Sequence, residues 1–121
     1  MDGLEIRSYE GEGWKPLIKF EPWSVAILNS APIYERGKIS MLEKHTDTDE
    51  VFVLLKGSCE LLIAGSGDTI GEIERVKMEA GQLYNVRQNV WHSCCLESDT
   101  SLLIVETMPP GTVRVDLPQP V

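Results

Sequence analysis

The sequence is poor in the residues that carry disulfide, metal or nucleic-acid chemistry. Its 121 residues include three cysteines, two histidines and 11 basic residues. Cys94 and Cys95 are adjacent, and Cys59 makes the number odd, which argues against a disulfide framework. The 19 acidic residues outnumber the basic ones and give a net charge of -8. Because the basic residues form no patch along the chain, we expect no nucleic-acid partner.

Long apolar segments are also lacking. No apolar run approaches the roughly 20 residues that a membrane-spanning helix needs. The N-terminal residues M-D-G-L-E-I-R-S have neither the basic start nor the apolar centre of a signal peptide. We therefore expect no membrane association, and the simplest location for the protein is the cytoplasm.

Helical periodicity is absent, and short runs with period-two alternation take its place. Glycine, proline, aspartate and serine separate these runs, a pattern typical of an all-β barrel or sandwich. Residues 9–16 are predicted to be a loop, because two glycines and a proline interrupt them. Residues 51–55 are continuously apolar, which predicts a strand buried on both faces. We expect about ten short strands in one domain spanning residues 1–121. The clearest strands are predicted at 23–30, 37–45, 51–55, 59–64, 72–78, 83–86, 90–96, 102–106 and 113–117.

Candidate metal ligands gather in one stretch, from Gly37 to Gly57. By alternation, one face of the predicted strand 37–45 carries Ile39, Met41, Glu43 and His45. The short loop to Glu50 returns a second carboxylate beside Glu43 and His45. His92, the other histidine, lies in the predicted strand 90–96. Two imidazoles and two carboxylates suit Zn²⁺, Mn²⁺, Fe²⁺ or Ni²⁺.

A calcium loop starting at Asp47 is excluded. Its sixth position would be Phe52 instead of glycine, and its twelfth would be Ser58 instead of glutamate.

The spacing of this stretch resembles the first motif of the cupin superfamily. That motif reads Gly, five residues, His-x-His, three or four residues, Glu, six residues, Gly. Here Gly37 is followed by five residues and Glu43, then by His45, by Glu50 after four residues, and by Gly57 after six. Glu43 stands where the family has its first histidine. A register that pairs His45 with Asp47 breaks the spacing on both sides, and we reject it.

The second cupin motif is matched more loosely. It reads Gly, five residues, Pro-x-Gly, two residues, His, three residues, Asn. Gly81 and His92 fall at their positions, whereas Arg87 replaces the proline, Asn89 the glycine and Leu96 the asparagine. Asparagine is tolerable at position 89, because it enters left-handed turns more easily than most residues.

The resemblance implies a double-stranded β-helix, or jelly-roll, barrel that forms a homodimer. It also implies one divalent metal ion held by a set of two histidines and two glutamates: Glu43, His45, Glu50 and His92. With both carboxylates bound, the ligands cancel the charge of a divalent ion, which favours lyase, isomerase or hydrolase chemistry over redox work. Glu43 can alternatively be a free base beside the metal.

Within the superfamily, Glu43, His45, Tyr84 and the pair Trp91-His92 also resemble the ureidoglycolate lyase type. We therefore expect a metal-dependent lyase or isomerase that acts on a small carboxylate or sugar-like molecule, with Glu43 and Tyr84 as candidate catalytic residues. Two alternatives stay open. One is a non-catalytic module that binds a small ligand, and the other is a structural cupin whose metal site has decayed.

Overall fold

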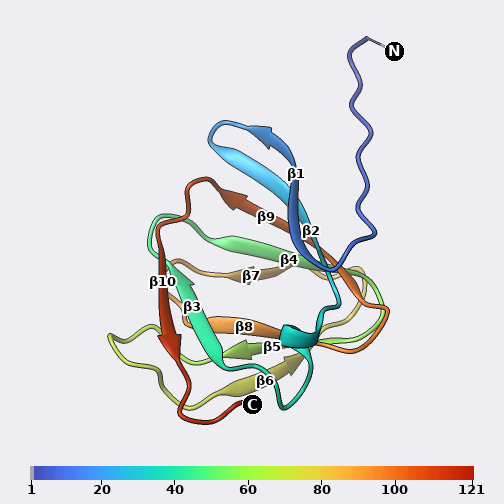
Figure 1. Ribbon diagram of the computed structural model, residues 1–121. Helices are drawn as coiled ribbons and strands as arrows, with labels where there is room; N and C mark the ends of the chain where they lie inside the picture. The colour runs from blue at the N-terminus through green and yellow to red at the C-terminus, as the bar shows by residue number, and fades with distance from the viewer. Residues whose placement is uncertain (1) are drawn as a thin grey trace.

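The computed structural model describes residues 2–121, and this part of the chain folds into two antiparallel five-stranded sheets that face each other (Figure 1). The first sheet has the order β1 (Gly13–Phe20), β2 (Trp23–Asn29), β9 (Ser101–Thr107), β4 (Glu50–Lys56) and β7 (Tyr84–Val86). The second has the order β10 (Thr112–Asp116), β3 (Met41–His45), β8 (His92–Leu96), β5 (Cys59–Ile63) and β6 (Glu74–Lys77). One 3-10 turn (Pro32–Tyr34) precedes β3. The predicted all-β jelly-roll architecture is confirmed.

Two cores stabilise the fold. The larger lies between the sheets and takes alternate residues from facing strands, such as Phe52 and Leu54 of β4 and Leu102 and Ile104 of β9. The smaller lies on the outer face of the second sheet, where the C-terminal residues Leu117 and Val121 and the loop between β5 and β6 cover it. Its fully buried members are Ile39, Leu42, Leu62, Ala64, Trp91 and Cys95.

Three details differ from the sequence predictions. The predicted loop 9–16 contains the start of β1, and Pro16 is tolerated there because β1 is an edge strand with an irregular register next to Pro16. The strand 51–55 is not buried on both faces, since Val51 and Val53 are half-buried and Leu55 is 51% exposed. Ile39 precedes β3 and belongs to the outer core, so it does not share the inward face with Glu43 and His45.

The motif glycines and Asn89 adopt left-handed backbone conformations, which glycine and asparagine accommodate more easily than other residues. Gly37, Gly57 and Gly81 all have positive φ angles, of 82°, 84° and 86°. Asn89 has φ 68°, so this asparagine occupies the left-handed conformation expected of it. Within residues 2–121, no helix is long and apolar enough to cross a membrane.

Candidate metal centre

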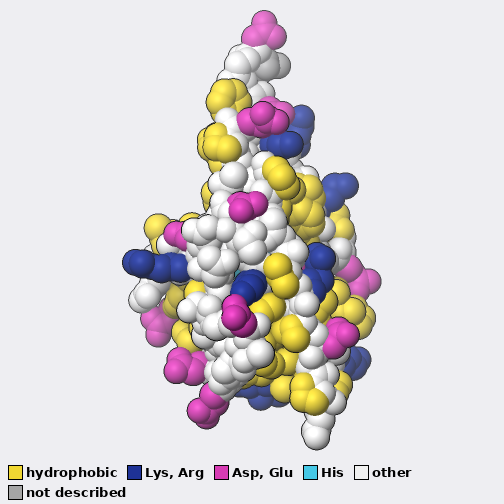
Figure 2. Space-filling view, turned by 90° about the vertical axis from the view of Figure 1, so that its left-hand side faces the viewer, with side chains coloured by type: hydrophobic (Ala, Val, Ile, Leu, Met, Phe, Trp, Pro, Cys, Tyr) yellow, Lys and Arg dark blue, Asp and Glu magenta, His cyan; other side chains and the backbone are white. Residues whose placement is uncertain are grey.

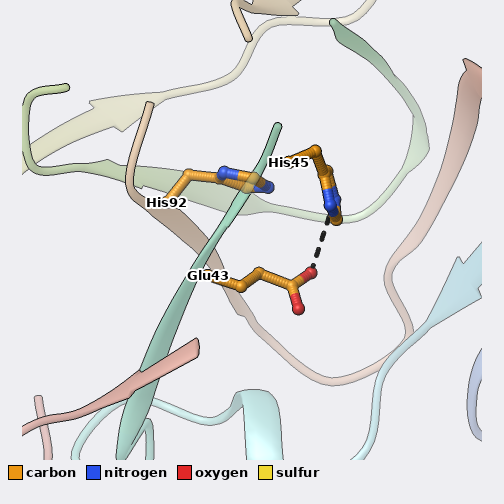
Figure 3. A group of neighbouring side chains, drawn as sticks. All are labelled: Glu43, His45 and His92. Atoms are coloured by element: carbon orange, nitrogen blue, oxygen red, sulfur yellow. Dashed lines mark ion pairs between the residues drawn. The ribbon is translucent and has the colours of Figure 1, made fainter. Parts of the chain in front are cut away.

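Five ionisable side chains converge on one cavity between the sheets. Glu43 and His45 come from β3, Glu50 from β4 and His92 from β8, so the structure brings together all four residues predicted as ligands. The fifth, Glu106, comes from β9. Figure 3 shows Glu43, His45 and His92 pointing toward one another. Ligand atoms of Glu43, His45 and His92 lie within 4.8 Å of one another, and those of His45, Glu50 and Glu106 do the same.

Glu106 is a buried carboxylate of this cavity that the sequence reasoning missed. The alternation of β9 could have identified Glu106 from the sequence, because Leu102, Ile104 and Glu106 share the buried face of this strand. Glu106 is only 7% exposed, and its Oε2 atom lies 3.4 Å from His45 Nε2. Burial, followed by the charge of Glu50, raises the pKa of Glu106 to about 7.

Neighbours outside the cluster orient both imidazoles. His92 Nδ1 lies 2.9 Å from the carbonyl oxygen of Val90, which can only accept, so Nδ1 carries a proton. His45 Nδ1 lies 2.9 Å from the Thr112 hydroxyl. In both rings the Nε2 atom therefore faces the cavity. A hydrogen bond from the remote nitrogen is the usual way in which proteins fix a metal-binding histidine.

The Nε2 atoms meet the same carboxylate oxygen. Glu50 Oε1 lies 2.9 Å from His92 Nε2 and 2.9 Å from His45 Nε2, and all three side chains are buried. Only the His92 contact has hydrogen-bond geometry; His45 Nε2 and Glu106 Oε2 have no hydrogen-bond partner within residues 2–121. Burying such atoms without a partner is costly, so the geometry fits a cation at their centre.

In the absence of a metal ion, protons on the two histidines balance the negative charge of the buried carboxylates. Burial lowers the pKa of each histidine, but the close contact with the negative charge of Glu50 outweighs it, so the pKa values of His45 and His92 are raised above 6.5. Burial raises the pKa of Glu50, but the two histidines outweigh it and lower that pKa to about 2. The cluster therefore holds positive charge tightly, as a metal site does.

The cavity is small and opens beside β10. Its volume is about 290 Å³, at the low end for small-molecule sites. Glu43 is 30% exposed at its mouth, with Oε1 3.7 Å from His45 Nε2 and Oε2 3.5 Å from Arg114 Nε. Arg114 is the single basic side chain among the described residues that line the cavity.

Tyr34, and not Tyr84, is the tyrosine of this cavity. Burial, followed by the negative charges of Glu43 and Glu50, raises the pKa of Tyr34, so its hydroxyl stays protonated at neutral pH. Tyr84 lines a different, apolar pocket, and its hydroxyl accepts a hydrogen bond of 2.8 Å from the backbone N–H of Glu79. The structure does not bring Tyr84 to the four predicted ligands.

No family model and no curated protein matches the sequence, but solved structures do. One is a cupin-2 domain protein from Shewanella frigidimarina, with 19% identity and a TM-score of 0.56 over 81% of this chain and 84% of that one. The chain has the cupin fold. Streptomyces PAC13 with uridine is 13% identical, with a TM-score of 0.62 over 90% of this chain and 83% of that one.

A further cupin-like structure is a 3,4-ketoisomerase from Helicobacter canadensis, with 14% identity and a TM-score of 0.56 over 74% of this chain and 65% of that one. At such identities the likeness establishes the fold alone. It confirms the cupin resemblance of the two motifs at that level, while the narrower resemblance to the ureidoglycolate lyase type stays a prediction.

Proposed function

We propose that the protein binds one divalent metal ion through Glu43, His45, Glu50 and His92 and catalyses a lyase or isomerase reaction on a small carboxylate. The main support for a metal is that the Nε2 atoms of His45 and His92 both lie 2.9 Å from Glu50 Oε1. Among the described residues, His45 Nε2 has no hydrogen-bond partner. The donor set of two imidazoles and two carboxylates suits Zn²⁺, Mn²⁺, Fe²⁺ or Ni²⁺.

Glu106 supports the same site as a further buried carboxylate. Its Oε2 atom has no hydrogen-bond partner within the described residues and lies close to His45 Nε2, which Glu50 also contacts. Glu106 can donate an oxygen to the ion or accept a hydrogen bond from a ligand of the ion. In either role it adds negative charge to the centre and strengthens the hold on a cation.

The chain's own residues supply the other parts of the reaction. When bound, the ion supplies Lewis-acid stabilisation of negative charge on a substrate oxygen. Tyr34 lines the cavity with a protonated hydroxyl, which can donate a hydrogen bond or a proton to the substrate. Glu43 reaches the mouth of the cavity, where one of its oxygens faces His45 and the other faces Arg114. We assign Glu43 to the ligand set, because its Oε1 atom points at His45.

Arg114 favours a substrate that carries a negative charge. Three glutamates make the cavity acidic, and Arg114 at its mouth is 60% exposed and held by Glu43. A guanidinium binds a carboxylate through two parallel hydrogen bonds. A substrate of a few carbon atoms can therefore place its carboxylate on Arg114 and another oxygen at the metal. The apolar wall of Leu28, Phe52 and Ile104 excludes water from the inner end.

The enzyme is favoured over the two rival functions. A module that only binds a ligand needs no ionisable groups beside the metal, but Tyr34 and Glu106 both lie in the cavity. A decayed site is expected to lose donors, whereas all four predicted ligands converge. The solved structures of similar fold include a 3,4-ketoisomerase, which is compatible with an isomerase.

The cysteines support a reducing compartment, and we propose the cytoplasm. All three are free and buried among the described residues. A hydrogen bond with Cys59, together with burial, raises the pKa of the Cys94 thiol well above its usual value. Cys94 therefore lines the cavity as a neutral thiol and not as a ligand.

Metal analysis tests the proposal. Plasma emission spectrometry after gentle purification, or after reconstitution with Zn²⁺, Mn²⁺, Fe²⁺ or Ni²⁺, should give about one ion per chain. Glu50→Gln should lower the metal content strongly. Asp47→Asn removes the same charge from an exposed position in the loop between β3 and β4, and it should leave the metal content unchanged. Absence of metal in the reconstituted wild-type chain, or equal losses in both variants, would contradict the assignment.

A further inference from the structure

The core between the two sheets is incompletely covered on the side of β6 and β7. β7 is the last strand of the first sheet, and β6 is the last strand of the second (Figure 1). Strand register pairs Val76 of β6 with the core residue Leu61, so Val76 faces inward, yet it is 37% exposed. Ile63, Tyr84 and Val90 pack against the same core and are only partly buried. The core therefore reaches the surface along this side.

A cavity of about 400 Å³ lies here, within the size range of small-molecule sites. Its apolar and aromatic lining consists of Leu61, Ile63, Val76, Tyr84, Val86 and Val90. The other two lining residues are Asn85 and Arg87, and no carboxylate of residues 2–121 lines the cavity. On the face shown in Figure 2, apolar, acidic and basic side chains are intermixed, so exposed apolar groups alone do not mark a site. This cavity differs, because a hollow, an apolar lining and one cationic group occur together.

Arg87 is the cationic group of this cavity. It is the one arginine of residues 2–121 that forms no ion pair, since the other four each contact a glutamate. The carboxylate oxygens of Asp49 accept hydrogen bonds from Asn85 Nδ2 at 3.0 Å and from the N–H of Gln88 at 2.8 Å. These bonds lower the pKa of Asp49, and the charge of Arg87 adds to the effect without a direct contact. Glu74 of β6 is exposed and does not line the cavity. The guanidinium therefore remains available to an anion.

Hydrogen bonds fix the wall that carries Arg87. The Tyr84 hydroxyl accepts a hydrogen bond of 2.8 Å from the N–H of Glu79, which links β7 to the turn that follows β6. At the other end of the wall, the N–H of Asn89 donates to the carbonyl oxygen of His45 at 2.8 Å. The cavity is thus preformed, and a ligand that enters it does not have to order the surrounding chain.

We propose that this cavity is a second binding site, separate from the metal centre, and that it takes a small apolar carboxylate such as a straight-chain fatty acid. A guanidinium binds a carboxylate through two parallel hydrogen bonds. The apolar lining would cover the hydrocarbon part and remove it from water. At roughly 30 Å³ for each atom of about the size of water, an acid of about eight carbon atoms needs about 300 Å³, which the cavity provides.

The proposal accounts for two residues of the second motif that the metal centre does not use. Arg87 stands where the cupin pattern has proline, a residue that cannot bind an anion through its side chain. Tyr84 lies outside the metal cavity, and its ring forms part of the apolar lining here. Among the described residues, none lines both cavities, so loss of one site leaves the other in place.

Titration with three probes tests the class of ligand. The full chain, loaded with Zn²⁺ and freed of excess ion, is titrated calorimetrically with octanoate, octanol and acetate. Octanoate should bind at least about 10-fold more tightly than either of the others, because it alone combines the apolar chain with the charge. Absence of octanoate binding, or equal affinity for octanoate and octanol, would overturn the proposal.

Arginine variants separate this cavity from the metal centre. Arg87→Met should weaken octanoate binding at least about 10-fold and leave octanol binding almost unchanged. Arg36→Met removes an exposed arginine outside both cavities, and Arg114→Met removes the cation of the metal cavity. Both should bind octanoate as the wild type does. Full affinity in Arg87→Met, or a loss in Arg114→Met that Arg87→Met does not share, would overturn the site.

NMR and a filled cavity test the location directly. In nitrogen–proton spectra of the Zn²⁺-loaded chain, octanoate should cause its largest shifts at the amides of Val76, Tyr84 and Val90. Val76→Phe occupies part of the cavity and should weaken both octanoate and octanol at least about 10-fold. The matched control Val113→Phe, at an exposed position of β10, should bind both as the wild type does. Largest shifts at residues of the metal cavity, or unchanged binding in Val76→Phe, would contradict the assignment.

Discussion

Glu43 and His92 lie directly opposite each other in the pairing of β3 with β8, and both side chains enter the same cavity. Their ligand atoms lie within 4.8 Å, although 48 residues separate them in the sequence. Because directly opposed residues of an antiparallel pair point to the same face, this one register position joins the first motif to the second. The predicted convergence of the two motifs is thereby confirmed.

Glu43→His should keep the metal and raise the net charge of the site by one. The substitution restores an imidazole at the position where the cupin pattern has one, and His45, Glu50 and His92 remain. If Glu43 is a ligand, spectroscopy of the Co²⁺-substituted protein should show one carboxylate ligand exchanged for nitrogen. An unchanged ligand spectrum with complete loss of activity would instead identify Glu43 as a free base.

Glu106→Gln should weaken metal binding about 10- to 100-fold without unfolding the chain. Glutamine keeps the shape of the side chain but removes the charge beside His45 Nε2. Isothermal titration with Zn²⁺ or Mn²⁺ measures the change. The control Glu60→Gln alters a carboxylate that pairs with Arg36 and Arg75 outside the cavity, and it should bind the metal as the wild type does. Unchanged affinity in Glu106→Gln would remove this residue from the centre.

The stability of the metal-free protein should fall as the pH rises above about 5. The pKa of Glu106 is raised from 4.5 to about 7, so its contribution is lost as the pH rises through that interval. The raised pKa values of His45 and His92 contribute below 6.5 and are lost at higher pH. The lowered pKa of Glu50 acts in the opposite direction, and its contribution is lost as the pH falls from 4.5 to about 2.

Saturating metal should remove the loss of stability at high pH, since the ion binds the deprotonated groups. Thermal melts between about pH 4 and pH 8, with chelator and with metal, compare the two states. A chelated protein whose melting temperature rises steadily from about pH 5 to pH 8 would refute the charge balance described for the cluster.

Arg114→Met should raise KM for a carboxylate substrate about 10- to 100-fold and change kcat much less, because it removes a binding contact outside the reacting centre. Arg36→Met removes an exposed arginine outside the cavity and is the matched control. Steady-state kinetics on the metal-loaded enzyme separate the two parameters. An equal effect of both substitutions would show that Arg114 contributes only general charge.

Gly57→Ala should destabilise the fold by about 2–5 kcal/mol, from backbone strain and overpacking together. A Cβ at this position would lie 2.6 Å from Thr100 Cα and 2.8 Å from the carbonyl oxygen of Asp99. Gly65→Ala has a similar φ, 76°, but no atom within 4 Å, so it should cost only the strain of about 1–2 kcal/mol. Urea unfolding of both variants measures the difference, and equal losses of stability would contradict overpacking against Thr100 and Asp99.

Spacing and parity predicted four of the side chains that meet in the cavity, because these residues lie on strands with regular alternation. Glu43 and His45 were placed correctly by their shared parity in β3. Glu106 obeys the same rule in β9, but a single glutamate at the end of an apolar strand carries no motif of its own. Tyr34 could not be predicted, since it lies in a 3-10 turn where no periodicity fixes the direction of a side chain.

The fold was predictable wherever turn residues separate the strands. β1 was missed because Pro16 normally interrupts a strand, and only its place at a sheet edge makes it acceptable. The outward residues of β4 suggested a buried second face, but local sequence cannot tell whether the chain itself or another molecule covers it. Val51 and Val53 are half-buried in the single chain, so the chain itself covers that face only in part.

Alternate residues of the five-residue strand β3 face two different environments, the cavity and the outer side of the second sheet. Its odd positions, Glu43 and His45, face the cavity, while Leu42 belongs to the outer core and Lys44 Nζ lies 4.6 Å from the centre of the Trp91 ring. A substitution of Glu43 or His45 alters the proposed donor set, and it leaves the packing around Leu42 and Trp91 untouched. Under the proposed function, the donor set can therefore change at position 43 or 45 without disturbing the outer core, and Glu43 stands where the cupin pattern has histidine.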